Sequence, residues 1–66
     1  MRVEVFEDQG DEPLFVGTFD ASPRVGDKIS KDAGGYFQYF EVVDLWHRCV
    51  DSSERFELCI SVRAVE

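Results

Sequence analysis

Apolar and polar residues alternate with a period of two along most of the chain, a pattern typical of β-strands with one buried face. Val3 and Val5, for example, alternate with Arg2 and Glu4. The pattern predicts five strands, over residues 2–7, 14–19, 28–30, 36–50 and 55–65. Clusters of glycine, proline, aspartate and serine separate them and indicate tight turns. The sequence therefore predicts an all-β fold.

Residues 20–27 form a connector between the second and third predicted strands. Pro23 fixes φ there, and Gly26 permits a turn with positive φ. The connector has room for at most one short helical turn, near residues 20–25. The run over residues 36–50 exceeds the usual length of a strand, so we expect a sharp bend or a bulge within it.

A tight loop over residues 51–54 sets the register of the last hairpin. On one face the expected cross-strand pairs are Val43 with Val62, Leu45 with Ile60, His47 with Leu58 and Cys49 with Phe56. On the other face they are Val42 with Arg63, Asp44 with Ser61, Trp46 with Cys59 and Arg48 with Glu57. The first set is apolar apart from the histidine, and we expect it to be buried. The opposite charges of Arg48 and Glu57 agree with this register.

The same register keeps the two cysteines, Cys49 and Cys59, on opposite faces of the hairpin. Placing them side by side would need a turn of a single residue, which the backbone cannot make. We therefore expect no disulfide within the chain and free thiols in a reducing compartment. A disulfide between two chains through an exposed Cys59 stays open.

Five strands joined by tight turns predict a single small β domain over residues 1–66, folded as an antiparallel barrel or a strongly bent sheet. A resemblance is carried by residues 23–29 (PRVGDKI), the Gly34-Gly35 turn and residues 36–44 (YFQYFEVVD). A strand with a hydrophobic-Gly-Asp-x-hydrophobic pattern that leads into a long alternating strand is similar to SH3-like small barrels. The resemblance implies a five-stranded SH3-like barrel, and such a fold does not imply a function.

Fourteen acidic residues against seven basic ones give the chain a formal net charge of −7. Direct binding to nucleic acid needs a basic surface, and so does docking on an anionic membrane, so we expect neither. No apolar stretch is long enough to cross a membrane, and residues 1–12 lack the apolar core of a secretory signal. We therefore expect a soluble, cytoplasmic protein.

The densest acidic segment covers residues 7–12 and is the strongest candidate for a partner-binding site. Its carboxylates, together with weaker candidates from the last hairpin, are Glu7, Asp8, Asp11, Glu12, Asp44, Glu54 and Glu57. The spacing of a calcium loop is absent from this segment, so we expect no metal there. A solvated hairpin tip is the plain alternative to a protein-binding site.

An apolar group of Val42, Trp46 and Cys59 lies on the outward face of the predicted last hairpin. Tryptophan is enriched at the centres of protein interfaces, so this face is a candidate contact with a partner protein or with a second copy of the chain. The alternative is that another part of the same domain covers the face.

The sequence carries no catalytic motif, since His47 is the only histidine and no nucleophile motif accompanies it. Zinc needs three or four nitrogen or sulfur ligands, and the chain offers only His47, Cys49 and Cys59, without paired spacing. We expect no catalytic residue, no metal and no cofactor. Six further aromatic residues could suggest a platform for stacking nucleic-acid bases, but core packing explains them better. They are Phe15, Phe19, Tyr36, Phe37, Tyr39 and Phe40.

In size and charge the chain is similar to phage-borne acidic inhibitors, among them DNA mimics and anti-CRISPR proteins. The resemblance implies a non-enzymatic interaction protein that occupies a basic, nucleic-acid-binding site of another protein, in the host-cell cytoplasm. The alternative is a structural or assembly module, a phage or accessory barrel that oligomerises through the Trp46 face, for example as a homodimer.

Overall fold

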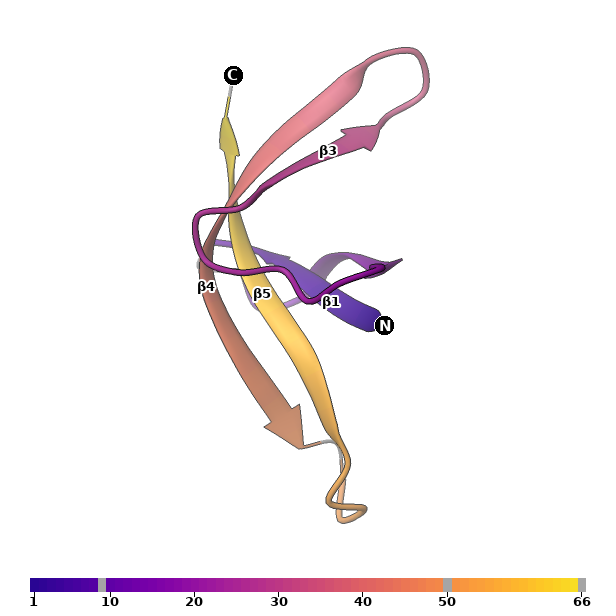
Figure 1. The fold of residues 1–66 in the computed structure, drawn as a ribbon, viewed down its shortest axis with the longest axis vertical. Coiled ribbons are helices and arrows are strands. Elements are labelled where there is room, and N and C mark those ends of the chain that lie inside the picture. Colours follow the sequence, from indigo (N-terminus) through magenta and orange to yellow (C-terminus); the bar gives the residue numbers. More distant parts are fainter. Residues whose placement is uncertain (9, 50, 66) are drawn as a thin grey trace.

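Five β-strands form one sheet in the computed structural model, which describes residues 1–8, 10–49 and 51–65 (Figure 1). They are β1 (Arg2–Glu7), β2 (Pro13–Thr18), β3 (Lys28–Asp32), β4 (Phe37–Cys49) and β5 (Phe56–Val65). The described residues contain no helix, so the predicted all-β class is confirmed. Gln9 of the predicted first turn and Val50 of the predicted long strand lie outside the described residues.

The strands lie in the order β2-β1-β5-β4-β3, and neighbouring strands run antiparallel except for β1 and β5. These two run parallel, with Val3 opposite Leu58 and Val5 opposite Ile60. The expectation of a purely antiparallel sheet is therefore wrong. Alternation along a strand indicates which face is buried, but it carries no information about the direction of a partner strand from the far end of the chain.

The sheet curls into a half-barrel, of which β2 and β3 are the two edges (Figure 1). Lys31 on β3 reaches toward β2, and its Nζ atom lies 5.4 Å from the centre of the Phe15 ring. The edges therefore approach each other without pairing in the described part of the chain. The predicted strongly bent sheet is confirmed, and its shape is compatible with a small β-barrel fold.

The last hairpin has the predicted register from Asp44 to Cys49. A bulge at Val43 then shifts the pairing by one residue, within the run whose length predicted a bend or a bulge. Val42 consequently lies opposite Val62, at the place predicted for Val43. Because one extra residue moves the side chains beyond it to the other face, the bulge turns Val42 into the core.

The core lies on the inner face of the half-barrel. It consists of the buried residues Val3, Val5, Phe40, Val42, Leu58, Ile60 and Val62, with Phe15, Phe19, Ile29 and Leu45 packed against them. The Phe15 and Phe40 rings meet edge to face, with their centroids 6.3 Å apart. β-Branched side chains dominate the centre of this core because they pack well on a pleated surface.

The β4–β5 hairpin extends beyond the strands beside it (Figure 1). The pairing of β1 with β5 begins only at Leu58, so no strand covers the hairpin between that residue and its turn. His47 and Cys49 are exposed here, and Phe56 is 63% exposed. The expectation that these three residues belong to the buried face is wrong, because the inner face has no neighbour at this end.

The β3–β4 hairpin extends in the same way at the other end of the sheet (Figure 1). The pairing of β4 with β5 ends at Tyr39 and Val65, so the hairpin continues as two strands only. Tyr36, Phe37 and Tyr39 are 62%, 56% and 51% exposed. The expectation of core packing therefore holds for Phe40 but is wrong for these three aromatic residues.

The connector over residues 20–27 contains no helical turn. Gly26 adopts a φ of 98°, and its N–H donates to the carbonyl of Val42 at 2.9 Å. The Val42 N–H in turn donates to the carbonyl of Asp27 at 2.9 Å. These two bonds tie the connector to the middle of β4.

Across the described residues, the structure has no helix with the length and apolar character needed to cross a membrane.

Candidate functional site

The loop between β1 and β2 holds the strongest acidic candidates at one end of the sheet. The N–H group of Asp8 donates to the carbonyl of Val62 on β5 at 2.9 Å. The N–H group of Gly10 donates to the carbonyl of Glu7 at 2.8 Å and tightens the turn. The loop is therefore anchored to β5, and its exposed carboxylates are those of Glu7, Asp8, Asp11 and Glu12.

Asp44 on β4 lies at the same end of the sheet as this loop. Both Asp44 and Phe6 of β1 are opposite Ser61 of β5, which places Asp44 close to the point where β1 runs into the loop. Its side chain is exposed, and its Oδ1 accepts a hydrogen bond from the N–H of Leu45 at 2.9 Å. We call the five residues the acidic end: Glu7, Asp8, Asp11, Glu12 and Asp44.

Glu54 and Glu57 do not join the acidic end. Glu54 lies in the β4–β5 turn with a φ of 60°. Glu57 is the second residue of β5, next to that turn. The Oε2 atom of Glu57 accepts a hydrogen bond from Nη1 of Arg2 at 2.6 Å. The seven acidic candidates therefore divide into five at one end of the sheet and two at the other.

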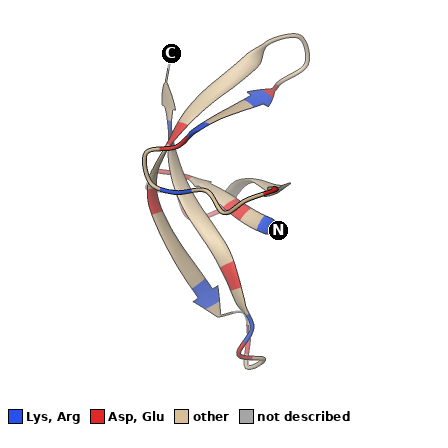
Figure 2. Cartoon of the chain, viewed as in Figure 1, with Lys and Arg blue, Asp and Glu red and all other residues tan. Residues whose placement is uncertain are grey.

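In the described part of the chain, three glutamates of the sheet are paired with arginines, whereas the carboxylates of the acidic end are not. Glu4, Glu41 and Glu57 each form an ion pair with an arginine. Within residues 1–8, 10–49 and 51–65, no carboxylate of the acidic end makes an ion pair. Figure 2 shows that acidic residues also occur elsewhere on the ribbon, for example in β5 and in the β4–β5 turn. Asp20, Asp27, Asp32, Asp51 and Glu54 also make no ion pair among the described residues, so the acidic end differs from the other carboxylates by the number of unpaired carboxylates gathered in one place.

The predicted apolar contact surface of Val42, Trp46 and Cys59 is not present as an exposed face. Val42 is 1% exposed and belongs to the core, and Cys59 is 0% exposed. Trp46 is half-buried, and its ring packs against Phe6 with the centroids 5.4 Å apart. The expectation of an exposed Cys59 is therefore wrong, and the bulge at Val43 separates Val42 from the other two residues.

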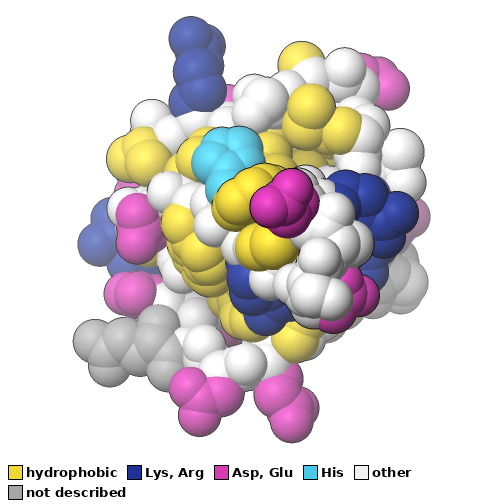
Figure 3. All heavy atoms as spheres, turned by 90° about the horizontal axis from the view of Figure 1, so that it is seen from below, with side chains coloured by type: hydrophobic (Ala, Val, Ile, Leu, Met, Phe, Trp, Pro, Cys, Tyr) yellow, Lys and Arg dark blue, Asp and Glu magenta, His cyan; other side chains and the backbone are white. Residues whose placement is uncertain are grey.

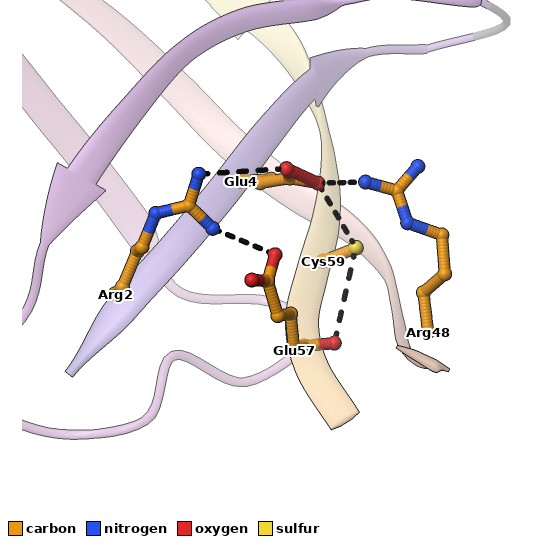
Figure 4. A network of polar contacts seen from close by, with 5 residues as sticks. All are labelled: Arg2, Glu4, Arg48, Glu57 and Cys59. Carbon is orange, nitrogen blue, oxygen red and sulfur yellow. Dashed lines mark hydrogen bonds and ion pairs between the residues drawn. The ribbon is translucent and has the colours of Figure 1, made fainter. Parts of the chain in front are cut away.

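A polar network covers the outer face of β1 and β5 (Figure 4). Trp46 lies opposite Cys59, one of its members. The Glu4 side chain is only 9% exposed, and its carboxylate accepts a hydrogen bond from Arg48 and lies 3.8 Å from Nη2 of Arg2. Arg2 also binds Glu57, so the network crosses from β4 over β5 to β1. The Cys59 thiol lies within it, 3.7 Å from Oε2 of Glu4.

The environment of Cys59 keeps its thiol protonated. Burial raises the pKa of this thiol, the positive charge of Arg48 opposes that rise, and the negative charge of Glu4 adds to it. The neutral thiol can donate to the Glu4 carboxylate, whereas a thiolate would face a second negative charge there. Cys59 is therefore a structural residue of the network. Both cysteines are free thiols, as the predicted register requires.

Sequence reasoning missed the network because it treated Glu4 as an ordinary outward-facing residue of an alternating strand. The residues that bury it lie far along the chain, and the parallel β1–β5 pairing brings Glu4 beside Cys59. The predicted pairing of Trp46 with Cys59 and of Arg48 with Glu57 was the available signal. This pairing puts a thiol, an aromatic ring and two charged groups on one face of the β4–β5 hairpin. It does not show that β1 pairs with β5 there.

The described residues contain no group of three or more histidine, cysteine, aspartate or glutamate side chains arranged to hold a metal ion. His47 is exposed at the β4–β5 hairpin, away from the acidic end. Comparisons of the chain with protein-family models, with curated proteins and with solved structures gave no match. The geometry of the acidic end and of the outer-face network therefore carries the functional argument.

Proposed function

We propose that this protein is a non-enzymatic interaction protein that binds a basic surface of a partner protein through its acidic end. The observation that carries the proposal is the concentration, at one end of the sheet, of five exposed carboxylates without an ion pair in the described part of the chain. Arginines neutralise Glu4, Glu41 and Glu57 on the sheet, while the five carboxylates of the acidic end have no cation among the described residues. A basic partner would supply the missing positive charge.

The charge of the whole chain supports this mode of binding. A net charge of −7 on a body of 66 residues creates a negative potential that steers a basic partner toward it. The backbone bonds from Asp8 to Val62 and from Gly10 to Glu7 restrain these described residues of the segment, and such restraint lowers the entropy lost on binding. Exposed charges are screened by salt, so the association is expected to weaken as ionic strength rises.

The most concrete form of the proposal is an inhibitor that occupies a nucleic-acid-binding site. Such sites carry lysine and arginine side chains placed to neutralise phosphates. Carboxylates on an anchored loop and an adjacent strand can take the place of phosphates in such a site. This is the mode of action of DNA mimics and of anti-CRISPR proteins of the mimic type, and it would operate in the cytoplasm of the host cell.

A titration with an oligolysine peptide, followed by ¹H–¹⁵N NMR, tests where this protein binds cations. The proposal predicts the largest shifts at residues 7–12 and at Asp44, and their loss at high salt. Shifts of equal size at Asp20, Asp32 and Glu54, which also lie in exposed segments, would contradict it. In that case the acidity would act as a diffuse charge without a preferred site.

A second candidate function, an assembly module, is favoured by the edge strand β2. Leu14 and Val16 are 47% and 48% exposed, and the strand contains no charged residue. Uncharged edge strands with exposed apolar side chains are templates for pairing with another chain. Sedimentation of the wild type and of Val16→Lys tests this function, with Val25→Lys as the control at an exposed valine outside the strands. A monomeric wild type at high concentration would exclude it.

A further inference from the structure

The exposed end of the β4–β5 hairpin forms one side of an open groove of about 540 Å³. Residues at the start of β1 and in the connector form the other side, so the groove joins segments that are far apart in the sequence. Its lining includes Met1, Arg2, His47, Arg55, Phe56 and Leu58. We call it the Phe56 groove. Its volume falls in the range of sites for small organic ligands.

Three apolar side chains, those of Met1, Phe56 and Leu58, line the Phe56 groove. Met1 and Phe56 are 57% and 63% exposed, whereas Leu58 is buried beside them. Figure 3 views the molecule from this end and shows hydrophobic side chains gathered around the histidine. An uncovered phenyl ring beside other apolar side chains favours a ligand that brings an apolar group of its own.

The charge of the groove is opposite in sign to that of the protein. Two arginines and one glutamate line it, whereas the whole chain has a net charge of −7. Arg2 is held by Glu57, but Arg55 makes no ion pair within the described residues. The His47 side chain likewise makes no hydrogen bond among the described residues, so its imidazole is available to a ligand. A guanidinium without a partner is a binding group for a carboxylate.

We propose that the Phe56 groove binds a small carboxylate that carries an aromatic group. The carboxylate pairs with Arg55, and the aromatic ring lies against Phe56 and Leu58. The acidic remainder of the protein repels anions, so only an anion that also gains apolar contact is retained. This site lies at the opposite end of the sheet from the acidic end, and it does not depend on the function proposed above.

An NMR titration with 3-phenylpropionate tests this site, with two comparison ligands. The amide of the same acid has the same shape without the charge, and acetate has the charge without the ring. The proposal predicts saturable shifts confined to the groove, at His47 and residues 55–58, with a dissociation constant on the order of 1 mM. Binding of the amide and of acetate should be at least about fivefold weaker.

Matched variants locate the two contacts. Arg55→Gln should weaken the binding of 3-phenylpropionate about fivefold, whereas Arg63→Gln, which removes an exposed arginine at the other end of the sheet, should leave it unchanged. Phe56→Ser should also weaken it, with Phe37→Ser as the control at an exposed phenylalanine of the other hairpin.

Four results would overturn the proposal. They are shifts that do not saturate, equal binding of the amide, equal binding of acetate, and an equal loss of affinity in the control variants. All four variants change exposed side chains, and a dispersed NMR spectrum of each confirms its fold before the titration. If Arg55→Gln nevertheless failed to fold, the comparison of acid with amide on the wild type would still decide the role of charge.

Discussion

Arg48 on β4 reaches across β5 to donate a hydrogen bond to the carboxylate of Glu4 on β1. The Glu4 side chain is 9% exposed, so its charge would be costly without this partner. The Arg48 guanidinium also lies over the Phe6 ring, 5.9 Å from its centroid. The pair therefore connects β4 with β1 across β5 on the outer face of the sheet.

Arg48→Met is expected to destabilise the protein by about 1–2 kcal/mol. The substitution leaves the Glu4 carboxylate buried with only Arg2 at 3.8 Å, and the estimate is kept low because Arg48 is itself 48% exposed. Urea unfolding measured by circular dichroism gives the free energy of unfolding. Arg63→Met, which breaks an exposed pair with Glu41, is the control and should cost less than about 1 kcal/mol.

Adding Glu4→Gln to Arg48→Met should restore part of the lost stability, because the second substitution removes the uncompensated charge. The double variant is therefore expected to be more stable than Arg48→Met alone, by up to about 1 kcal/mol. A double variant less stable than the single one would show that Glu4 contributes mainly through its hydrogen bonds and shape rather than through its charge.

The two cysteines are expected to react with alkylating reagents at very different rates. Cys49 is exposed, whereas Cys59 is buried and burial raises the pKa of its thiol, which lowers the amount of reactive thiolate. Mass spectrometry after brief treatment with iodoacetamide should find Cys49 modified and Cys59 unmodified in the native protein. In urea both should react. Rapid modification of Cys59 in the native state would contradict its place in the network.

The stability of the protein should fall with rising pH through the ionisation of Cys59. The folded state raises the pKa of this thiol, so the unfolded chain loses its proton first. The contribution of Cys59 to stability is fully present below pH 9.0, the ordinary pKa of the thiol, and is lost as the pH rises through the higher pKa of the folded state. Unfolding titrations should show this decline in the wild type and in Cys49→Val. Persistence of the full decline in Cys59→Val would assign it to other groups.

Gly35→Ala is expected to cost about 1–2 kcal/mol in the free energy of unfolding. Gly35 has a φ of 112°, and beyond its two chain neighbours no atom lies within 4 Å of the position that a Cβ would take, so the cost is backbone strain. Gly34 has a φ of 81°, closer to the left-handed region that asparagine tolerates. Gly34→Asn should therefore cost less than Gly35→Ala, and the reverse order in thermal unfolding would contradict this reading.

Local patterns predicted much of the fold. The alternation of apolar residues and the turn residues gave five strands near their observed positions, and the pairing of Asp44 with Ser61 through that of Cys49 with Phe56 is confirmed. The parallel pairing of β1 with β5 was not predictable in this way. It depends on how the β1–β2 hairpin docks on the β4–β5 hairpin. The alternation along β1 puts Val3 and Val5 on one face of the strand whichever way the strand runs.

The candidate site was predicted in part. The dense acidic segment at residues 7–12 identified the loop. The observed strand pairing shows that Asp44 lies near this loop, whereas Glu57 lies at the other end of the sheet and pairs with Arg2. The apolar group at Trp46 was wrong because one extra residue at Val43 turned Val42 inward. The side of a strand on which a side chain lies depends on each bulge between it and the turn, and the sequence predicted an irregularity without its position.

The most direct test of the acidic end is competition with DNA for a basic, non-specific DNA-binding protein. Fluorescence anisotropy of a labelled duplex would follow its displacement by the wild type at low salt. A variant neutralised at the loop carries Glu7→Gln, Asp8→Asn, Asp11→Asn and Glu12→Gln. A control with the same net charge carries Asp20→Asn, Asp32→Asn, Asp51→Asn and Glu54→Gln.

We predict that the wild type and the control displace the duplex, and that the loop variant requires at least about tenfold more protein to do so. Equal displacement by the loop variant and the control would contradict the account, because it would show that total charge, and not the acidic end, determines binding.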